Sequence, residues 1–403
     1  MRTTRPKLVL VGFLALHTLC ALAGAASGEF KVLYTFTGGA DGDGPLAGLV
    51  LDNLGNGYGT TCAGGAFRNG VAYEISPASG GKWTETVLYN FGSGSDGQCP
   101  KSALTFDSSG NLYGTTSIGG TYGAGTVFEL SRTPMGWAET VLHNFGDSQV
   151  DGTDPSAGVT FDSTGNIYGT TNRGGYYGAG AVYVLSPSGG SATERVIYDF
   201  RPHTTSEVSS SGVAFDSFGN LYGTTATGGS YGCGNVFMLA KSGSHWIWSS
   251  IHDFRCFPFG DTPYSTPTFD SLGNLYGTTL YGGATNAGTV FRLSPHGGGW
   301  NFALLHSFTG SDGSNPTVGV STSPSGNTLY GTTSSGNGIW GTAYYLAPDI
   351  GRKWTEHVLH SFHNGPDEGY PNCLPVVDAH GNIYGTAWIP QTSHGLVFEV
   401  LSN

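Results

Sequence analysis

The stretch Gly110-Asn-Leu-Tyr-Gly-Thr-Thr116 decides the fold, because versions of it return along the whole chain. The gaps between the tyrosines of successive copies are 55, 55, 54, 54, 54 and 54 residues. A period this regular indicates one supersecondary unit that is stacked against copies of itself. The seven tyrosines are Tyr58, Tyr113, Tyr168, Tyr222, Tyr276, Tyr330 and Tyr384.

The unit around this stretch is predicted to hold four short strands. They cover residues 103–107, 111–116, 126–130 and 137–145, and turns or a glycine-rich loop separate them. Such a succession is typical of an antiparallel meander. Four strands in about 54 residues, repeated seven times, predict an all-β protein, a seven-bladed β-propeller of four-stranded antiparallel blades. The shortest and most apolar strand of each blade is expected innermost, and the longest and most polar outermost.

The two ends of the repeat region complement each other. Residues 30–36 match an outer strand, whereas residues 395–401 match a third strand. The last blade therefore lacks its outer strand and the N-terminus has one to spare. We expect the N-terminal strand to close the ring on the last blade, which removes an open sheet edge.

Composition indicates an exported protein. Glycine accounts for 68 of 403 residues, and only 11% of residues are charged. A basic start, an apolar run over residues 8–22 and the small residues at 23–25 predict a signal peptide over residues 1–25. The alternative is an uncleaved membrane anchor, for which the run is short. Residues 26–403 are then one secreted, periplasmic or cell-surface domain, expected to be a monomer without a membrane span.

Charge excludes one class of partner. Removal of residues 1–25 takes away three basic and no acidic residues, so the net charge changes from −12 to −15. Such a surface repels nucleic acid and anionic lipid.

The fuller repeat has four parts: Asp-Gly-x-x-Pro, Gly-Asn-Leu-Tyr-Gly-Thr-Thr, Gly-Gly and Gly-Thr-Val-Phe. Over residues 30–401 it resembles the bacterial Gloeo-Verruco (GloVer) tandem repeat. Residues 155–168 also resemble the sequence pattern of NHL-type propeller repeats. The resemblance implies an exported, sometimes surface-anchored repeat protein of unknown activity, and it supplies no catalytic residues. The sixth unit departs from the pattern, since Ser323 replaces a turn aspartate.

Three repeated series are interpreted as structural. An aspartate at the start of a tight turn bonds the backbone two residues on. A Tyr/His series lies two residues before the last Phe of each outer strand, and it favours packing between blades over a metal site, because neighbouring outer strands diverge. Tryptophans that open five outer strands are expected to cover the blade edge. The series are Asp52, Asp107, Asp162, Asp216, Asp270 and Asp378; Tyr34, Tyr89, His143, Tyr198, His252, His306 and His360; and Trp83, Trp137, Trp246, Trp300 and Trp354.

The loops carry the candidate ligand-binding residues. Loops between second and third strands emerge on the same face as loops between blades. Aromatic rings beside carboxylates on one face are a pattern by which proteins hold sugars. The sequence favours the other reading, in which the rings fold back over the glycines and Asp-Gly is turn chemistry. Asp41 and Asp43 are a candidate Ca²⁺ site resting on one short Asp-x-Asp. The binding candidates are Phe67, Tyr122, Tyr177, Tyr231, Asp96, Asp151 and Asp312, with Asp41 in the same acidic series.

No catalytic constellation stands out. Glycoside hydrolysis needs two carboxylates of unequal pKa across one cleft, and near-identical blades offer no singular pair. The sequence contains neither Gly-x-Ser-x-Gly nor His-Glu-x-x-His. We therefore predict a binding or scaffolding module for glycan or protein at the cell envelope or outside the cell, with no cofactor. A carbohydrate-active enzyme, hydrolase or lyase, is the alternative; irregular units such as residues 201–206 would hold its site.

Five cysteines follow the leader, none in a Cys-x-x-Cys pair, so a zinc site of that kind is not expected. Cys233 and Cys256 lie symmetrically about residues 244–245, which predicts a disulfide across one hairpin. Cys62 and Cys99 lie in loops on one face and form the second predicted pair. Cys373 is then free, with Cys62–Cys373 as the fallback.

Overall fold

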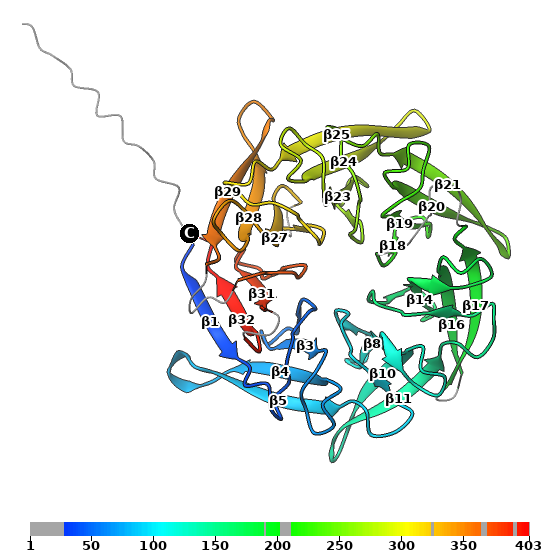
Figure 1. The fold of residues 1–403 in the computed structure, drawn as a ribbon. Helices are drawn as coiled ribbons and strands as arrows, with labels where there is room; N and C mark the ends of the chain where they lie inside the picture. Colours follow the sequence, from blue (N-terminus) through cyan, green and yellow to red (C-terminus); the bar gives the residue numbers. More distant parts are fainter. Residues whose placement is uncertain are drawn as a thin grey trace, which may run out of the picture.

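The computed structural model describes residues 28–188, 191–201, 211–323, 326–363, 369–389 and 393–402. Seven four-stranded antiparallel sheets stand in a ring around a central axis (Figure 1). The predicted seven-bladed all-β propeller is confirmed. One 3₁₀ turn, η1 (Ser79–Gly81), is the only helical element within these ranges, and no helix in them is long and apolar enough to cross a membrane. The predicted signal peptide lies outside the described residues.

In blades 1 to 6 the chain runs from the innermost strand to the outermost. Blade 1 holds β2 (Val50–Leu51), β3 (Gly57–Thr61), β4 (Val71–Pro77) and β5 (Trp83–Asn90). Blade 2 holds β7 (Thr105–Phe106), β8 (Leu112–Thr116), β10 (Thr126–Thr133) and β11 (Gly136–Asn144). Blade 3 holds β13 (Thr160–Phe161), β14 (Ile167–Thr171), β16 (Ala181–Ser188) and β17 (Ser191–Asp199). Blade 4 holds β18 (Ala214–Phe215), β19 (Leu221–Thr225), β20 (Asn235–Ser242) and β21 (His245–Asp253).

Blade 5 holds β22 (Thr268–Phe269), β23 (Leu275–Thr279), β24 (Thr289–His296) and β25 (Gly299–Ser307). Blade 6 holds β26 (Ser321–Thr322), β27 (Leu329–Thr333), β28 (Thr342–Pro348) and β29 (Trp354–Ser361). Blade 7 holds β30 (Val376–Val377), β31 (Ile383–Ala387), β32 (Leu396–Val400) and, as its outer strand, β1 (Phe30–Thr35). Two short ladders join loops: β6 (Gly97–Gln98) with β9 (Ile118–Gly119), and β12 (Gly152–Thr153) with β15 (Arg173–Gly174).

The innermost strands are shorter than predicted. The sequence predicts a strand over residues 103–107, yet only Thr105 and Phe106 pair with β8. The segment just before these two residues bonds to blade 1 instead of to β8. The Ser102 carbonyl accepts a hydrogen bond from the Thr60 hydroxyl at 3.2 Å. The outer strand of blade 2 agrees with its prediction to within one residue at each end.

The threonine that follows Tyr-Gly in each repeat joins neighbouring blades. Its buried hydroxyl donates to a backbone carbonyl of the next blade over 2.7–3.2 Å. Seven such bonds run around the inner part of the ring, and the one from blade 7 reaches blade 1. The pairs are Thr60–Ser102, Thr115–Ala157, Thr170–Ser211, Thr224–Ser265, Thr278–Val318, Thr332–Cys373 and Thr386–Ala47.

The first strand of the chain closes the ring, as predicted. β1 pairs antiparallel with β32, with Phe30 opposite Val400 and Thr35 opposite Leu396. Figure 1 shows the two strands, blue and red, side by side in blade 7. The Phe30 ring also stacks on His360 of blade 6, with ring centroids 4.0 Å apart. The first and last strands of the chain are thereby held in one sheet.

The turn aspartates have the structural role expected of them. Asp162 Oδ1 accepts the backbone N–H groups of Thr164 and Asn166, at 2.9 and 3.0 Å. Its Oδ2 accepts the Asn166 side-chain amide at 2.8 Å and the Tyr168 hydroxyl at 3.1 Å. Burial acts against ionisation, but these hydrogen bonds prevail and lower the pKa of Asp162 to about 2. In blades 1 to 5 the Asp, Asn and Tyr of the repeat therefore form one bonded turn, whereas in blade 7 the Tyr384 hydroxyl donates to Glu399 instead.

The tryptophans pack on the repeat tyrosine of the preceding blade. The Tyr58 ring meets Phe106 and Trp137 of blade 2 edge-on, at centroid distances of 5.2 and 6.4 Å. Trp83 meets Tyr384 at 6.4 Å, which repeats the contact across the closed seam. Each of these interfaces between blades thus has its own aromatic core.

Two repeat glycines are required by close approach. A Cβ on Gly114 would lie 2.7 Å from the Phe128 ring, so the second strand can pass over that ring only without a side chain. Gly125 has φ +97°, and a Cβ there would lie 2.7 Å from Pro155 of the next inter-blade loop.

Candidate functional site on the loop face

The predicted loop aromatics are exposed. The exposed fractions are 48% for Phe67, 56% for Tyr122, 40% for Tyr177 and 51% for Tyr231. Each ring lies in the loop between the second and third strands of blades 1 to 4, which opens on one face of the ring. The rings do not fold back over their glycines, so they are available to a ligand.

The predicted loop carboxylates lie deeper. Asp96 is only 7% exposed and accepts the backbone N–H groups of Gly92 and Gly94, at 3.0 and 3.1 Å. Asp151 is 4% exposed and accepts from Gly146. These carboxylates hold their own loops, and the aromatic rings are the part of the candidate set that faces solvent.

The Tyr/His series bonds these aspartates. The Tyr34 hydroxyl donates to Asp41 at 3.0 Å, and Tyr89 donates to Asp96 at 2.9 Å. His306 Nε2 lies 3.1 Å from Asp312 Oδ2. His143 Nε2 lies 3.5 Å from Asp151 Oδ2, within ion-pair range but without a formed hydrogen bond. The series therefore ties each of these outer strands to the loop that follows it.

A glutamate from the next blade completes these four junctions. One buried carboxylate oxygen of each glutamate, Oε1, has no hydrogen-bond partner. Burial, and next the charge of the loop aspartate, raise the pKa of Glu85, Glu139 and Glu194 to about 7 and that of Glu356 to about 8. The four sets are Tyr34–Asp41–Glu85, Tyr89–Asp96–Glu139, His143–Asp151–Glu194 and His306–Asp312–Glu356.

An aromatic ring replaces the glutamate at the other three junctions. Trp248 stacks on Tyr198 with centroids 5.8 Å apart, and Phe302 stacks on His252 at 4.3 Å. The Phe30–His360 stack is the third case. The expected packing of the Tyr/His series between blades is confirmed there.

Blade 3 carries the hollows that the loop aromatics line. Two adjoining hollows of about 370 and 280 Å³ share Tyr176, Val196 and Asp199. Tyr177 and Arg201 line the first, whereas the second extends to Val150, Asp151, Glu194 and Ser148 of the blade 2–3 junction. A larger hollow of about 790 Å³ lies elsewhere, between β1 and the turn before Trp83, where none of the loop aromatics lies.

The rings in the blade 3 site are held in place. The Asp199 carboxylate accepts the Tyr176 backbone N–H at 2.8 Å. Tyr176, 69% exposed, meets Tyr177 edge-on with centroids 4.9 Å apart. The Arg201 guanidinium lies over Tyr177 at 5.1 Å. The first hollow thus offers an exposed ring, a cation and a carboxylate, and the second adds two acidic side chains.

Sequence reasoning missed Tyr176 as a member of the candidate site. Tyr176 precedes a predicted ring, and the Tyr-Tyr doublet in a glycine-rich loop was an available signal. Arg201 opens the irregular segment singled out in the sequence, whose residues 202–206 lie outside the described part of the chain. Phe257 and Phe259, 59% and 55% exposed, add rings after blade 4, in a second irregular segment of the repeat at residues 256–259.

The candidate Ca²⁺ ligands have separate partners. Asp41 accepts the Thr37 N–H at 2.7 Å and the Tyr34 hydroxyl. Asp43 Oδ2 lies 3.2 Å from His394 Nδ1, whereas its Oδ1 is buried without a partner. Both oxygens of Asp41 thus have partners within the chain, whereas Asp43 keeps one oxygen without a hydrogen bond.

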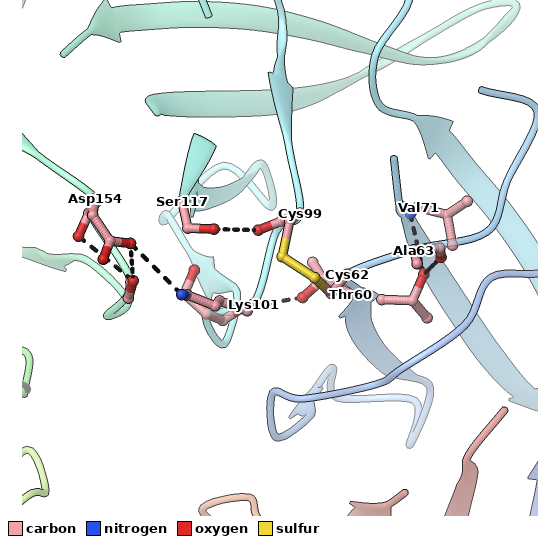
Figure 2. Close-up of a disulfide and its surroundings, with 11 residues drawn as sticks. Thr60, Cys62, Ala63, Val71, Cys99, Lys101, Ser117 and Asp154 are labelled. Atoms are coloured by element: carbon pink, nitrogen blue, oxygen red, sulfur yellow. Dashed lines mark hydrogen bonds and ion pairs between the residues drawn. A yellow bond between two sulfur atoms is a disulfide. The ribbon is translucent and has the colours of Figure 1, made fainter. Parts of the chain in front are cut away.

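Both predicted disulfides are formed, and Cys373 is free and buried. Figure 2 shows Cys62 of blade 1 bonded to Cys99, in the loop that leads to blade 2. The Cys99 carbonyl accepts from Ser117 at 3.2 Å, and Lys101 pairs with Asp154 of the following inter-blade loop at 3.6 Å. Covalent and ionic links thus join blades 1, 2 and 3 on the loop face.

Solved structures share the fold at low sequence identity. Hydrazine synthase from Kuenenia stuttgartiensis is 14% identical with a TM-score of 0.56, over 90% of this chain and 96% of that one. A candidate 6-phosphogluconolactonase from Bacteroides uniformis is 13% identical with a TM-score of 0.52, over 83% and 92%. A Lactobacillus plantarum protein is 14% identical with a TM-score of 0.51, over 82% and 86%. These likenesses show the fold alone.

No curated protein matches the sequence. The sequence profile described as the Gloeobacter/Verrucomicrobia repeat matches residues 22–153, 130–339 and 209–403, which together span nearly the whole chain. The chain belongs to the Gloeobacter/Verrucomicrobia repeat family.

Proposed function

We propose that this propeller is an exported binding module that holds a glycan on its loop face, with the blade 3 site at its centre. The observation that carries the proposal is the exposed Tyr176–Tyr177 pair beside Arg201 and Asp199 in one depression. An aromatic ring stacks on the apolar face of a sugar, and charged groups at its edge bond the hydroxyls. The two disulfides and the basic-apolar N-terminal sequence support export.

Phe67, Tyr122 and Tyr231 extend the proposed surface over blades 1, 2 and 4. Because they lie in equivalent loops, they would meet a long glycan or the surface of an extracellular protein at several points. The same face could instead hold an extracellular protein, which would make the propeller a scaffold. A binding screen with glycans and proteins would distinguish the two roles.

The test is a glycan array followed by calorimetry on the mature protein. Tyr176→Ala with Tyr177→Ala is expected to abolish binding of the array hits, with a change in stability under about 0.5 kcal/mol because the rings are exposed. The matched control is Phe218→Ala, because Phe218 is 88% exposed on a turn of the opposite face. Binding that survives the double change contradicts the proposal, and so does binding that is lost in the control, because the loss is then not specific to the loop face.

A carbohydrate-active enzyme, hydrolase or lyase, is the second candidate. Asp151 and Glu194 line one hollow, and burial and the Asp151 charge raise the pKa of Glu194 to about 7, which suits a general acid. The same residue types recur at three other junctions, which favours a structural role. Glu194→Gln distinguishes the two, since an enzyme loses turnover of the array hits but keeps their binding, whereas a binding module shows no turnover before or after.

A further inference from the structure

One junction between blades brings together a mixed set of metal-binding groups. Among the described residues, His306, Asp312 and Glu356 form the one group of three whose ligand atoms all lie within 4.8 Å of one another. His306 belongs to β25 of blade 5, Asp312 to the loop that follows, and Glu356 to β29 of blade 6. The set offers one imidazole nitrogen and two carboxylates.

The spacing suits a single ion. Two protein ligands bound to one Zn²⁺ at about 2.0–2.2 Å lie roughly 3–3.5 Å from each other. His306 Nε2 and Asp312 Oδ2, 3.1 Å apart, already have this spacing. Glu356 must approach by up to roughly 1.5 Å. Its Oε1 is buried without a hydrogen-bond partner, so the movement of this oxygen breaks no bond.

The surroundings orient these groups. Asp312 Oδ1 accepts the backbone N–H and the hydroxyl of Thr309, at 2.8 and 2.9 Å, which leaves Oδ2 directed at His306. The fully buried Tyr344 hydroxyl, on the next blade, also lacks a partner. The side chains of His306 and Asp312 are 17% and 19% exposed, so an ion can enter and a water molecule can complete its coordination.

We propose that the junction of blades 5 and 6 binds a divalent transition-metal ion through His306 Nε2, Asp312 and Glu356, with Zn²⁺ as its probe. Imidazole with two carboxylates is a ligand set for ions of intermediate hardness, and three protein ligands leave a position for water. Each of His143 and His306 meets carboxylates of its own junction.

The chain contains its own control junctions. Tyr34 and Tyr89 stand where His306 does, beside the same Asp and Glu types, and burial raises the pKa of both phenols, so they stay protonated. His252 stands beside Phe302 rather than a glutamate. His143 has the same partners as His306 but at a longer distance, 3.5 Å to Asp151. A tyrosine at position 306 is therefore compatible with the fold and removes the nitrogen ligand.

The experiment uses untagged, EDTA-stripped protein that carries His143→Tyr, so that the looser copy cannot contribute. Calorimetry and competition with a chromophoric chelator are expected to give one equivalent of Zn²⁺, and Zn²⁺ is expected to raise the Tm. Adding His306→Tyr should weaken binding by at least about tenfold and remove the Tm shift. Adding His252→Tyr, the matched control, should change neither.

An anomalous difference map at the zinc edge locates the ion. A peak between His306 and Glu356 supports the proposal, and Glu356→Gln should remove it. Absence of Zn²⁺ binding in the His143→Tyr background, binding that survives His306→Tyr, or a peak at another position each overturns it. The junction is then a hydrogen-bonded His–Asp pair beside a protonated glutamate.

Discussion

At the scale of single residues, the junction glutamates couple stability to pH. Burial and the charge of Asp96 raise the pKa of Glu139 from an ordinary 4.5 to about 7 in the folded protein. A carboxyl whose pKa is raised by folding favours the fold while it is protonated. Its contribution to the free energy of unfolding is therefore fully present below about pH 4.5 and is lost as the pH rises through about 7.

Glu139→Gln is therefore expected to raise the Tm at pH 8 and to leave it nearly unchanged at pH 4.5. One pKa unit corresponds to about 1.4 kcal/mol, and partial hydration of the site reduces the full shift to a gain of about 1–2 kcal/mol. Thermal melts from pH 4.5 to 8 measure this. Glu29→Gln, an exposed control, should shift nothing; an equal gain at both pH values would mean that ionisation is not the cause.

The repeat turn is the second feature at this scale. Asp162→Ala removes the acceptor of two backbone N–H groups and of the Tyr168 hydroxyl, so we expect a loss of about 2–3 kcal/mol. Denaturant titration measures it. Asp162→Asn keeps one acceptor oxygen and should cost less; equal losses in the two variants would show that these hydrogen bonds are not what matters.

At the scale of elements, β1 is the strand on which ring closure depends. Deletion of residues 26–37 would leave the edge of β32 open and expose the apolar face that Phe30 covers. We expect aggregation or a lower Tm, because an unpaired apolar edge strand recruits other chains. Size-exclusion chromatography with thermal melts tests this. A monomer with an unchanged Tm would show that closure does not depend on β1.

The two disulfides connect segments on the loop face. Cys233 and Cys256 are 23 residues apart and join the two ends of one hairpin. Their replacement by serine is expected to cost about 3 kcal/mol, which is typical for a loop of this length. In the mature wild-type protein, a thiol reagent should detect no cysteine before unfolding and Cys373 alone after it; two or more reactive thiols without reductant would contradict the pairing.

At the scale of the whole molecule, the ring was predictable and its junctions were not. The 54-residue period predicted the seven blades, and the length and polarity of the strands predicted their order within a blade. The unmatched strands at the two ends predicted the closure. A repeat aligns each unit with its copies, however, whereas a junction combines two units: Asp96 and Glu139 meet only after blades 1 and 2 are docked. The loop rings of the candidate site were predictable from their repeat positions, whereas the depression beside them requires the placement of Arg201 and Val196.

The joins between blades also set the order in which this molecule can be completed. Of the described strands, β1, which seals the ring, is synthesised before all the others, and its partner β32 is synthesised after them. The Thr386–Ala47 bond likewise waits for the final blade. Until then the nascent chain is an open arc with two unsatisfied edges, so partial chains are the species most exposed to misassembly.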